Sequence, residues 1–169
     1  MSTSDPQIIP ATAEHAEAIW RIFQEVIATG DAYVFESGTT RDEFIAYWFA
    51  PSCHPHIALL DDEVVGSYIV KPNQPGRGSH IANASYMTAS AARGQGIAGK
   101  MCQHSLQLAK SLGFRAMQFN IVVATNTVAV ALWQKHGFSI VGTLPGAFHH
   151  ATLGYVDAHV MFRGLDDIA

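Results

Sequence analysis

The chain has 169 residues, of which 49% are hydrophobic, and a formal net charge of -4. This length and apolar content predict a single domain over residues 1–169 and exclude an intrinsically disordered chain. The absence of a signal-peptide pattern and of any run of about 18 apolar residues predicts a cytoplasmic protein without a membrane span, in which Cys53 and Cys102 are reduced.

The amino-terminal half predicts, in chain order, a strand, two helices and two strands. The strand covers residues 7–10, and Thr12 and Gly30 mark the start and stop of the first helix. The capping box at residues 40–43 opens a second helix that runs to about Phe49. The loop between the helices, residues 31–39, carries aromatic side chains, and the two strands follow at 56–60 and 64–70.

The carboxy-terminal half alternates strands and helices after a glycine-rich turn. The predicted ranges are strand 81–88, helix 96–112, strand 115–123, helix 126–136, and strands 138–144 and 155–162. Gly113 and Gly137 stop the two helices. The order β-α-α-β-β-β-α-β-α-β-β predicts an α/β sheet with mixed strand directions.

The glycine-rich turn, A-A-R-G-Q-G-I-A-G-K-M at residues 91–101, matches three phosphate-binding patterns. A P-loop is excluded because Met101 replaces the metal-binding Ser or Thr, and no acidic partner follows before Asp157. A dinucleotide fingerprint is excluded because residues 114–125 hold no acid for the ribose. The third pattern, R-x-x-G-x-A, fits a coenzyme A pyrophosphate, which backbone N–H groups at the helix start and Arg93 would bind.

The charges support a polyanionic ligand. No Asp or Glu lies between Val64 and Val156, whereas seven Lys and Arg residues do. Nucleic acid is a weaker candidate because these cations are dispersed and no basic-aromatic recognition motif accompanies them.

The motifs R-G-Q-G-I-A at 93–98 and N-x-x-A-x-x-L-W-x-K-x-G-F at 126–138 resemble those of the GCN5-related N-acetyltransferase (GNAT) superfamily, over residues 7–165. The resemblance implies an α/β (α+β) fold with a mixed, mostly antiparallel sheet and helices on both faces. Its central parallel strands, 81–88 and 115–123, would splay apart around acetyl-CoA. It also implies direct acetyl transfer to an amine, no metal, and a possible homodimer.

The resemblance assigns the coenzyme to residues in and around the two motifs. The implied contacts are Met87, Thr88, Arg93, Gly94, Gln95, Gly96, Ile97, Ala98, Asn126 and Trp133. Many superfamily members carry, in place of Trp133, a Tyr that can protonate the departing thiolate. Because an indole does not give up its proton in this way, we expect Trp133 to pack beside the coenzyme.

Further stretches, such as Y-I-V-K-P-N at 68–73 and F-N-I-V-x-x-T-N at 119–126, are similar to superfamily members that acetylate proline analogues. In those members, asparagines matching Asn83 and Asn120 hold the small imino acid. The resemblance therefore implies Asn83 and Asn120 as catalytic and substrate-binding residues, with Phe35 as a further substrate contact. Physically, a buried amide can donate to a substrate carboxylate.

Two routes are open for the proton that the acceptor amine loses. It can leave through water and strand carbonyls, or a carboxylate from the first half of the chain can accept it. In the second case Glu36, in the loop 31–39, is the best-placed base. We favour the water route.

Two other functions stay open at this point: acetylation of a protein or peptide amino terminus, and coenzyme A binding without catalysis. The aromatic loop 31–39 argues against a bulky acceptor, and the missing Tyr favours the non-catalytic alternative slightly. The pairs His54 and His56, and His149 and His150, match no zinc motif and are interpreted as structural or solvent-exposed.

Overall fold

The computed structural model describes residues 5–169; residues 1–4, which the single-domain prediction includes, lie outside the described part. Seven strands form one sheet in the order β1-β2-β3-β4-β5-β7-β6. Their bounds are β1 Gln7–Pro10, β2 His54–Leu60, β3 Glu63–Pro72, β4 Ile81–Thr88, β5 Ala116–Val123, β6 Ser139–His150 and β7 Gly154–Gly164. Neighbouring strands are antiparallel except β4 and β5, so the predicted mixed sheet is confirmed.

Four α-helices connect the strands in the predicted order. They are α1 Ala16–Thr29, α2 Arg41–Trp48, α3 Ile97–Ser111 and α4 Thr127–Lys135. Gly30 ends α1 in the left-handed conformation, and the Thr40 capping box with Glu43 opens α2. A 3-10 turn over Ala13–His15 precedes α1, so Thr12 caps this turn and not α1 itself.

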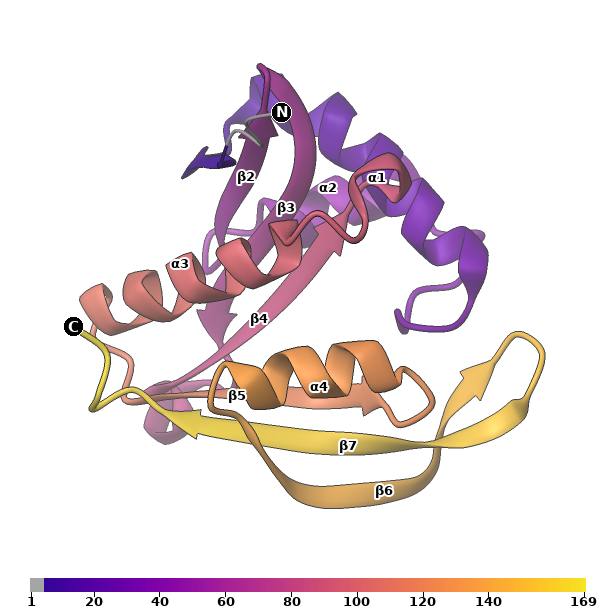
Figure 1. Ribbon diagram of the computed structural model, residues 1–169, viewed down its shortest axis with the longest axis vertical. Helices are drawn as coiled ribbons and strands as arrows, with labels where there is room; N and C mark the ends of the chain where they lie inside the picture. The colour runs from indigo at the N-terminus through magenta and orange to yellow at the C-terminus, as the bar shows by residue number, and fades with distance from the viewer. Residues whose placement is uncertain (1–4) are drawn as a thin grey trace.

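The helices cover both faces of the sheet, as the resemblance implied (Figure 1). On one face α1 and α2 bury Phe23, Phe44 and Trp48 against sheet residues such as Ile69 and Met87. On the other face α3 buries Met101, Cys102 and Leu106, and α4 packs against the same core through Val130 and Trp133. Both cysteines are unpaired and buried. None of the helices between residues 5 and 169 combines the length and apolar character that a membrane span requires.

The central feature of the sheet is the divergence of β4 from β5. The two strands pair at only two positions, Ile81 with Ala116 and Ala82 with Met117, and then separate (Figure 1). Each strand keeps its outer partner, since β3 follows β4 to Thr88 and β7 follows β5 to Val123. The predicted splayed pair is therefore confirmed, and backbone groups along the gap must find partners other than a sheet ladder.

The last hairpin is longer than predicted. β6 continues past Leu144 to His150, because Pro145 and Gly146 are accommodated within the strand instead of ending it. The register between β6 and β7 shifts between Leu144 and Phe148, and Gly146 has φ +58°. A proline and a bulge are tolerated there because β6 is an edge strand with only one neighbour. The extended hairpin reaches beyond the end of β5 (Figure 1).

Candidate active site

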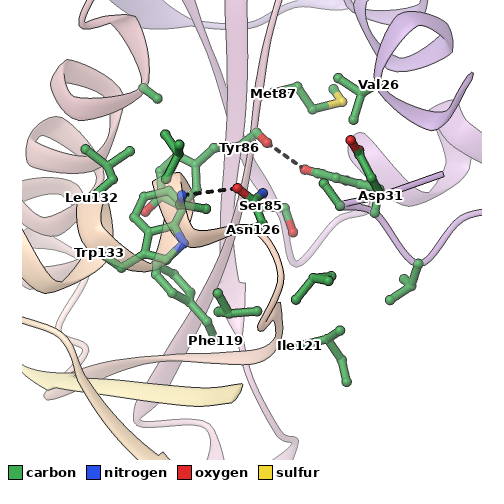
Figure 2. Close-up of a pocket in the computed structure, with 18 of the residues that line it drawn as sticks. Val26, Asp31, Ser85, Tyr86, Met87, Phe119, Ile121, Asn126, Leu132 and Trp133 are labelled. Atoms are coloured by element: carbon green, nitrogen blue, oxygen red, sulfur yellow. Dashed lines mark hydrogen bonds between the residues drawn. The ribbon is translucent and has the colours of Figure 1, made fainter. Parts of the chain in front are cut away.

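The gap between β4 and β5 opens into a pocket of about 680 Å³. One side is lined from α3 and α4, by residues that include Ala98, Asn126, Leu132 and Trp133. The opposite side is lined from the α1–α2 loop, α2 and the β6–β7 hairpin, by residues that include Asp31, Tyr33, Phe35, Tyr47, His150 and Leu153. Figure 2 shows Leu132 and Trp133 across the pocket from Asp31 and Val26, with Tyr86 and Ser85 of β4 between them.

The glycine-rich turn presents bare backbone beside the α3 and α4 side of this pocket. Gly94 and Gly96 have φ values of +77° and +80°, and a Cβ atom on either would meet nothing within 4 Å. No side chain caps α3, and its first backbone hydrogen bond runs from the Lys100 N–H to the Gly96 carbonyl, at 3.1 Å. The preceding N–H groups at the positive helix end can therefore receive an anion. The arrangement fits a pyrophosphate.

A hydrogen-bonded anchor holds the start of this turn. The Glu25 carboxylate on α1 accepts hydrogen bonds from the Ser90 backbone N–H at 2.8 Å and from the Ser90 hydroxyl at 2.9 Å. These two bonds, and the nearby Arg93 charge, lower the pKa of Glu25. Arg93 is exposed and lines the pocket, so its guanidinium is free to add a cation beside the helix end.

Asn83 lies where the β4–β5 ladder ends. Its side chain lines the pocket, is 9% exposed, and donates from Nδ2 to the Gln118 carbonyl at 2.9 Å. That carbonyl follows the last β4–β5 pair at Met117, so the asparagine replaces the missing strand partner. With one Nδ2–H engaged, the amide keeps its Oδ1 acceptor and its second Nδ2–H donor for a ligand.

Asn120 and Glu36 lie outside the residues that line the pocket. Asn120 is exposed; it donates to Asn73 Oδ1 at 2.8 Å and accepts from Gln118 Nε2 at 2.9 Å. Glu36 is also exposed, on the α1–α2 loop. Its neighbour Phe35 does line the pocket.

The aromatic α1–α2 loop is fixed onto the sheet. Tyr33 donates its hydroxyl to the Tyr86 carbonyl on β4 at 3.0 Å, one of the two dashed contacts in Figure 2. Burial raises the pKa of Tyr33, so its hydroxyl stays protonated and able to donate. Phe35 packs edge-on against Phe23 and Tyr47, with ring centroids 5.3 and 5.1 Å apart. Aromatic side chains therefore restrict the volume on this side of the pocket.

The second motif also takes part in the pocket. Asn126 caps α4 by accepting from the Ala129 N–H at 3.2 Å, the other dashed contact in Figure 2. The Trp133 ring packs against Tyr86 and Phe119, each with a centroid distance of 4.9 Å. Trp133 thus occupies a packing position, and Tyr86 directs its hydroxyl to Ser105 at 2.6 Å. Burial raises the pKa of Tyr86 well above its ordinary value.

The residues predicted to contact the coenzyme fall into two groups. Six of them line the pocket: Met87, Thr88, Arg93, Ala98, Asn126 and Trp133. The other four form the adjoining turn and the first residue of α3: Gly94, Gln95, Gly96 and Ile97. In this second group the Ile97 side chain is buried in the core beneath α3, so only its backbone N–H can face a ligand.

Sequence patterns did not single out several further polar residues in the lining, among them Asp31, Tyr47 and His150. They come from a loop, a helix and a hairpin that the fold alone brings together, and no spacing pattern connects them. In the described part of the chain, no three His, Cys, Asp or Glu side chains gather into a metal-binding cluster.

Comparisons with known proteins agree with this arrangement. The family model "Acetyltransferase (GNAT) family" matches residues 16–138. The chain is 34% identical to the N-acetyltransferase aca1 of Schizosaccharomyces pombe, over 83% of this chain and 77% of that protein. It is 28% identical to the L-amino acid N-acetyltransferase AaaT of Escherichia coli, over 67% and 69% of the two chains.

A solved GCN5-related N-acetyltransferase from Kribbella flavida is 43% identical and superimposes with a TM-score of 0.90, covering 95% of this chain and 98% of that one. The family model, the relatives and the solved structure all identify an N-acetyltransferase. The chain belongs to the acetyltransferase (GNAT) family and is an acetyl-CoA-dependent acyltransferase.

Proposed function

We propose that this enzyme transfers the acetyl group of acetyl-CoA to the amine of a small amino or imino acid by direct attack. The observation that carries the proposal is one continuous pocket that joins the glycine-rich turn to an aromatic, loop-covered chamber across the β4–β5 gap. Donor and acceptor could enter from opposite sides and meet between the strands. The printed name of the Escherichia coli relative, an L-amino acid N-acetyltransferase, supports an acceptor of this class.

The donor side fits the phosphates and the pantetheine arm. The turn at residues 93–98 offers uncapped N–H groups and the Arg93 charge to the pyrophosphate. Asn126, Trp133 and β4 residues Met87 and Thr88 would flank the arm as it enters the gap.

The acceptor side fits a small molecule. Tyr33, Phe35 and Tyr47 enclose it, and Asn83 faces it from β4. In the transfer the amine nitrogen bonds to the acetyl carbonyl carbon, the carbon–sulfur bond breaks, and coenzyme A leaves as the thiolate. The amine proton leaves through water in our preferred route; Glu36, exposed and outside the pocket lining, would have to move to serve as the base. Asn120 would act from the outer edge of the pocket, held in place by its hydrogen bonds with Asn73 and Gln118.

An acetyl-transfer assay with a panel of acceptors tests the proposal. Purified protein, acetyl-CoA and single amino acids, imino acids or short peptides are incubated, and both free coenzyme A and the acetylated acceptor are quantified. We expect equal amounts of the two products with small amino or imino acids. Turnover with peptides alone would establish the peptide alternative, and acetyl-CoA binding without turnover would establish the non-catalytic one.

A further inference from the structure

The acceptor side of the pocket is bordered by a cation with no acidic partner. Lys71 on β3 is half-buried, and no ion pair in the described residues 5–169 includes it. Its Nζ lies instead 4.6 Å from the ring centroid of Tyr47. Burial raises the pKa of the Cys53 thiol despite the opposing effect of the Lys71 charge, so that thiol stays neutral and does not balance the ammonium.

Lys71 lies between two residues that line the pocket. It is the direct cross-strand partner of Asn83 in the antiparallel β3–β4 pair. Directly opposed residues point to the same face, with Cβ atoms about 5 Å apart. Asn83 and Tyr47 both line the pocket, so Lys71 adjoins it on two sides without itself being part of the lining. Its flexible four-carbon stem allows the ammonium to leave the Tyr47 ring and reach an anion beside Asn83.

The polar groups around this point are complementary to a zwitterion. Asn83 uses one of its two Nδ2–H donors on the Gln118 carbonyl, and its Oδ1 can accept an amine N–H of the substrate. A carboxylate on the carbon next to that amine then needs a donor or a cation nearby. Lys71 is the cation placed there, in a segment without Asp or Glu from residue 65 to residue 155.

We propose that Lys71 binds the carboxylate of the acceptor and thereby selects amino or imino acids over amines that lack a carboxylate. This assignment rests on the proposed function and adds the residue that sets its substrate class. Two side chains would then recognise the acceptor. Asn83 Oδ1 accepts a hydrogen bond from the amine, and the Lys71 ammonium pairs with the carboxylate.

Paired acceptors test the role of Lys71. Steady-state kinetics are measured with an amino or imino acid and with its carboxamide, in the wild type, Lys71→Met, Lys71→Arg and, as a control, Arg21→Met at an exposed position of α1. A lost charge-assisted contact lowers kcat/KM by about 10- to 100-fold. We expect Lys71→Met to show this loss for the acid, mainly through KM, with little change for the carboxamide. Lys71→Arg should retain most of the activity, and Arg21→Met should match the wild type.

The outcomes separate this inference from the function on which it rests. An equal loss for acid and carboxamide in Lys71→Met would mean that Lys71 only holds Tyr47 and α2 in place, which overturns its role in selectivity. A wild type that uses both acceptors equally well, or a Lys71→Met variant that matches it, would also overturn that role while leaving the acetyltransferase activity intact. A wild type that acetylates no member of any pair would overturn the proposed function itself.

Discussion

At the scale of single residues, the two asparagines that the resemblance selected occupy different environments. Asn83 is buried at the end of the β4–β5 ladder and supplies a hydrogen bond that the sheet no longer provides. Asn120 is exposed and bonded to other amide side chains. An asparagine in the middle of an apolar strand disfavours strand structure, and for Asn83 the splay gives a structural reason for its presence in addition to any role toward substrate.

Replacing each asparagine by alanine distinguishes the two environments. Asn83→Ala leaves the Gln118 carbonyl without its donor, which should cost about 1–3 kcal/mol of stability. It should also lower kcat/KM for the acceptor by about 10-fold or more, with the KM for acetyl-CoA unchanged. Asn120→Ala, at an exposed site, should change stability by about 0.5 kcal/mol or less. Urea denaturation and acceptor kinetics provide the measurements, and equal stability losses in both variants would contradict this distinction.

A second residue-scale feature is a histidine pair packed around Tyr68, on the α3 face of the sheet. The His56 ring stacks on Tyr68 with a centroid distance of 5.1 Å, and His104 Nδ1 lies 2.7 Å from the Tyr68 hydroxyl. Burial lowers the pKa of both histidines below the ordinary value of 6.5. Below about pH 6.5 the unfolded chain therefore binds more protons than the folded protein does. The free energy of unfolding falls as the pH drops through this range.

Denaturation at two pH values tests this coupling. Unfolding free energies are measured at about pH 7.5 and about pH 5.5, above and below the pKa of an unperturbed histidine. The wild type should be less stable at the lower pH, and His104→Gln should lose less stability between the two values. His80→Gln, at an exposed position, serves as the control and should keep the wild-type difference. A His104→Gln variant with the full wild-type difference would exclude His104 as a contributor.

At the scale of elements, the turn into α3 is the part of the site that the sequence predicted most directly. The spacing pattern predicts Gly94 and Gly96 as coenzyme contacts, and both adopt positive φ with open space around the missing side chain. The uncapped helix start also follows from the sequence, because no Ser, Thr, Asp or Asn occupies the cap position at Gly96. Local patterns of this kind are predictable since they depend on a few consecutive residues.

Substitutions at Gly96 test the anion site. Gly96→Ala and Gly96→Glu share the same backbone cost of left-handed conformation, about 1 kcal/mol. Only the glutamate adds a negative charge at the helix start, where it opposes a bound phosphate. We expect Gly96→Glu to abolish acetyl-CoA binding measured by calorimetry, whereas Gly96→Ala should retain measurable affinity. Wild-type affinity in Gly96→Glu would place the pyrophosphate elsewhere.

The elements that could not be predicted are those that distant contacts determine. The predicted strand ends at Leu144, whereas β6 continues to His150, because an edge strand tolerates Pro145 and Gly146. Residues that line the side of the pocket proposed for the acceptor, such as Asp31 and His150, come from segments more than a hundred positions apart. The position of Lys71 beside the pocket follows only from the strand register opposite Asn83 and from its contact with Tyr47, neither of which a sequence pattern predicts.

At the scale of the whole molecule, the pocket is closed by two segments from opposite ends of the chain. The α1–α2 loop descends from one helical layer, and the β6–β7 hairpin extends toward it from the far edge of the sheet (Figure 1). They meet where the Ala151 N–H donates to the Gly30 carbonyl at 2.9 Å. Asp31, next to Gly30, and His150, next to Ala151, both line the pocket, so this contact borders the side of the pocket that we propose for the acceptor.

The closeness of the contact makes Gly30 a sensitive position. A Cβ atom on Gly30 would lie 2.7 Å from the Ala151 Cβ, a distance at which one of the two segments must move. Gly30 also has φ +61°, so an alanine there adds backbone strain. Gly113 offers a matched control, since it has φ +89° and no atom within 4 Å of a Cβ. Each glycine-to-alanine change therefore carries a similar strain of about 1 kcal/mol, and only the one at Gly30 displaces the hairpin.

We expect Gly30→Ala to raise the KM for the acceptor several-fold more than Gly113→Ala does, because displacement of the hairpin tip loosens the acceptor side of the pocket. The affinity for acetyl-CoA should be the same in both variants, since both substituted glycines lie outside the turn at residues 93–98, which we propose as the pyrophosphate site. Acceptor kinetics at saturating acetyl-CoA, together with calorimetric acetyl-CoA binding, measure the two quantities separately. If Gly30→Ala and Gly113→Ala show the same acceptor KM, the contact between loop and hairpin stabilises the fold without shaping the acceptor site.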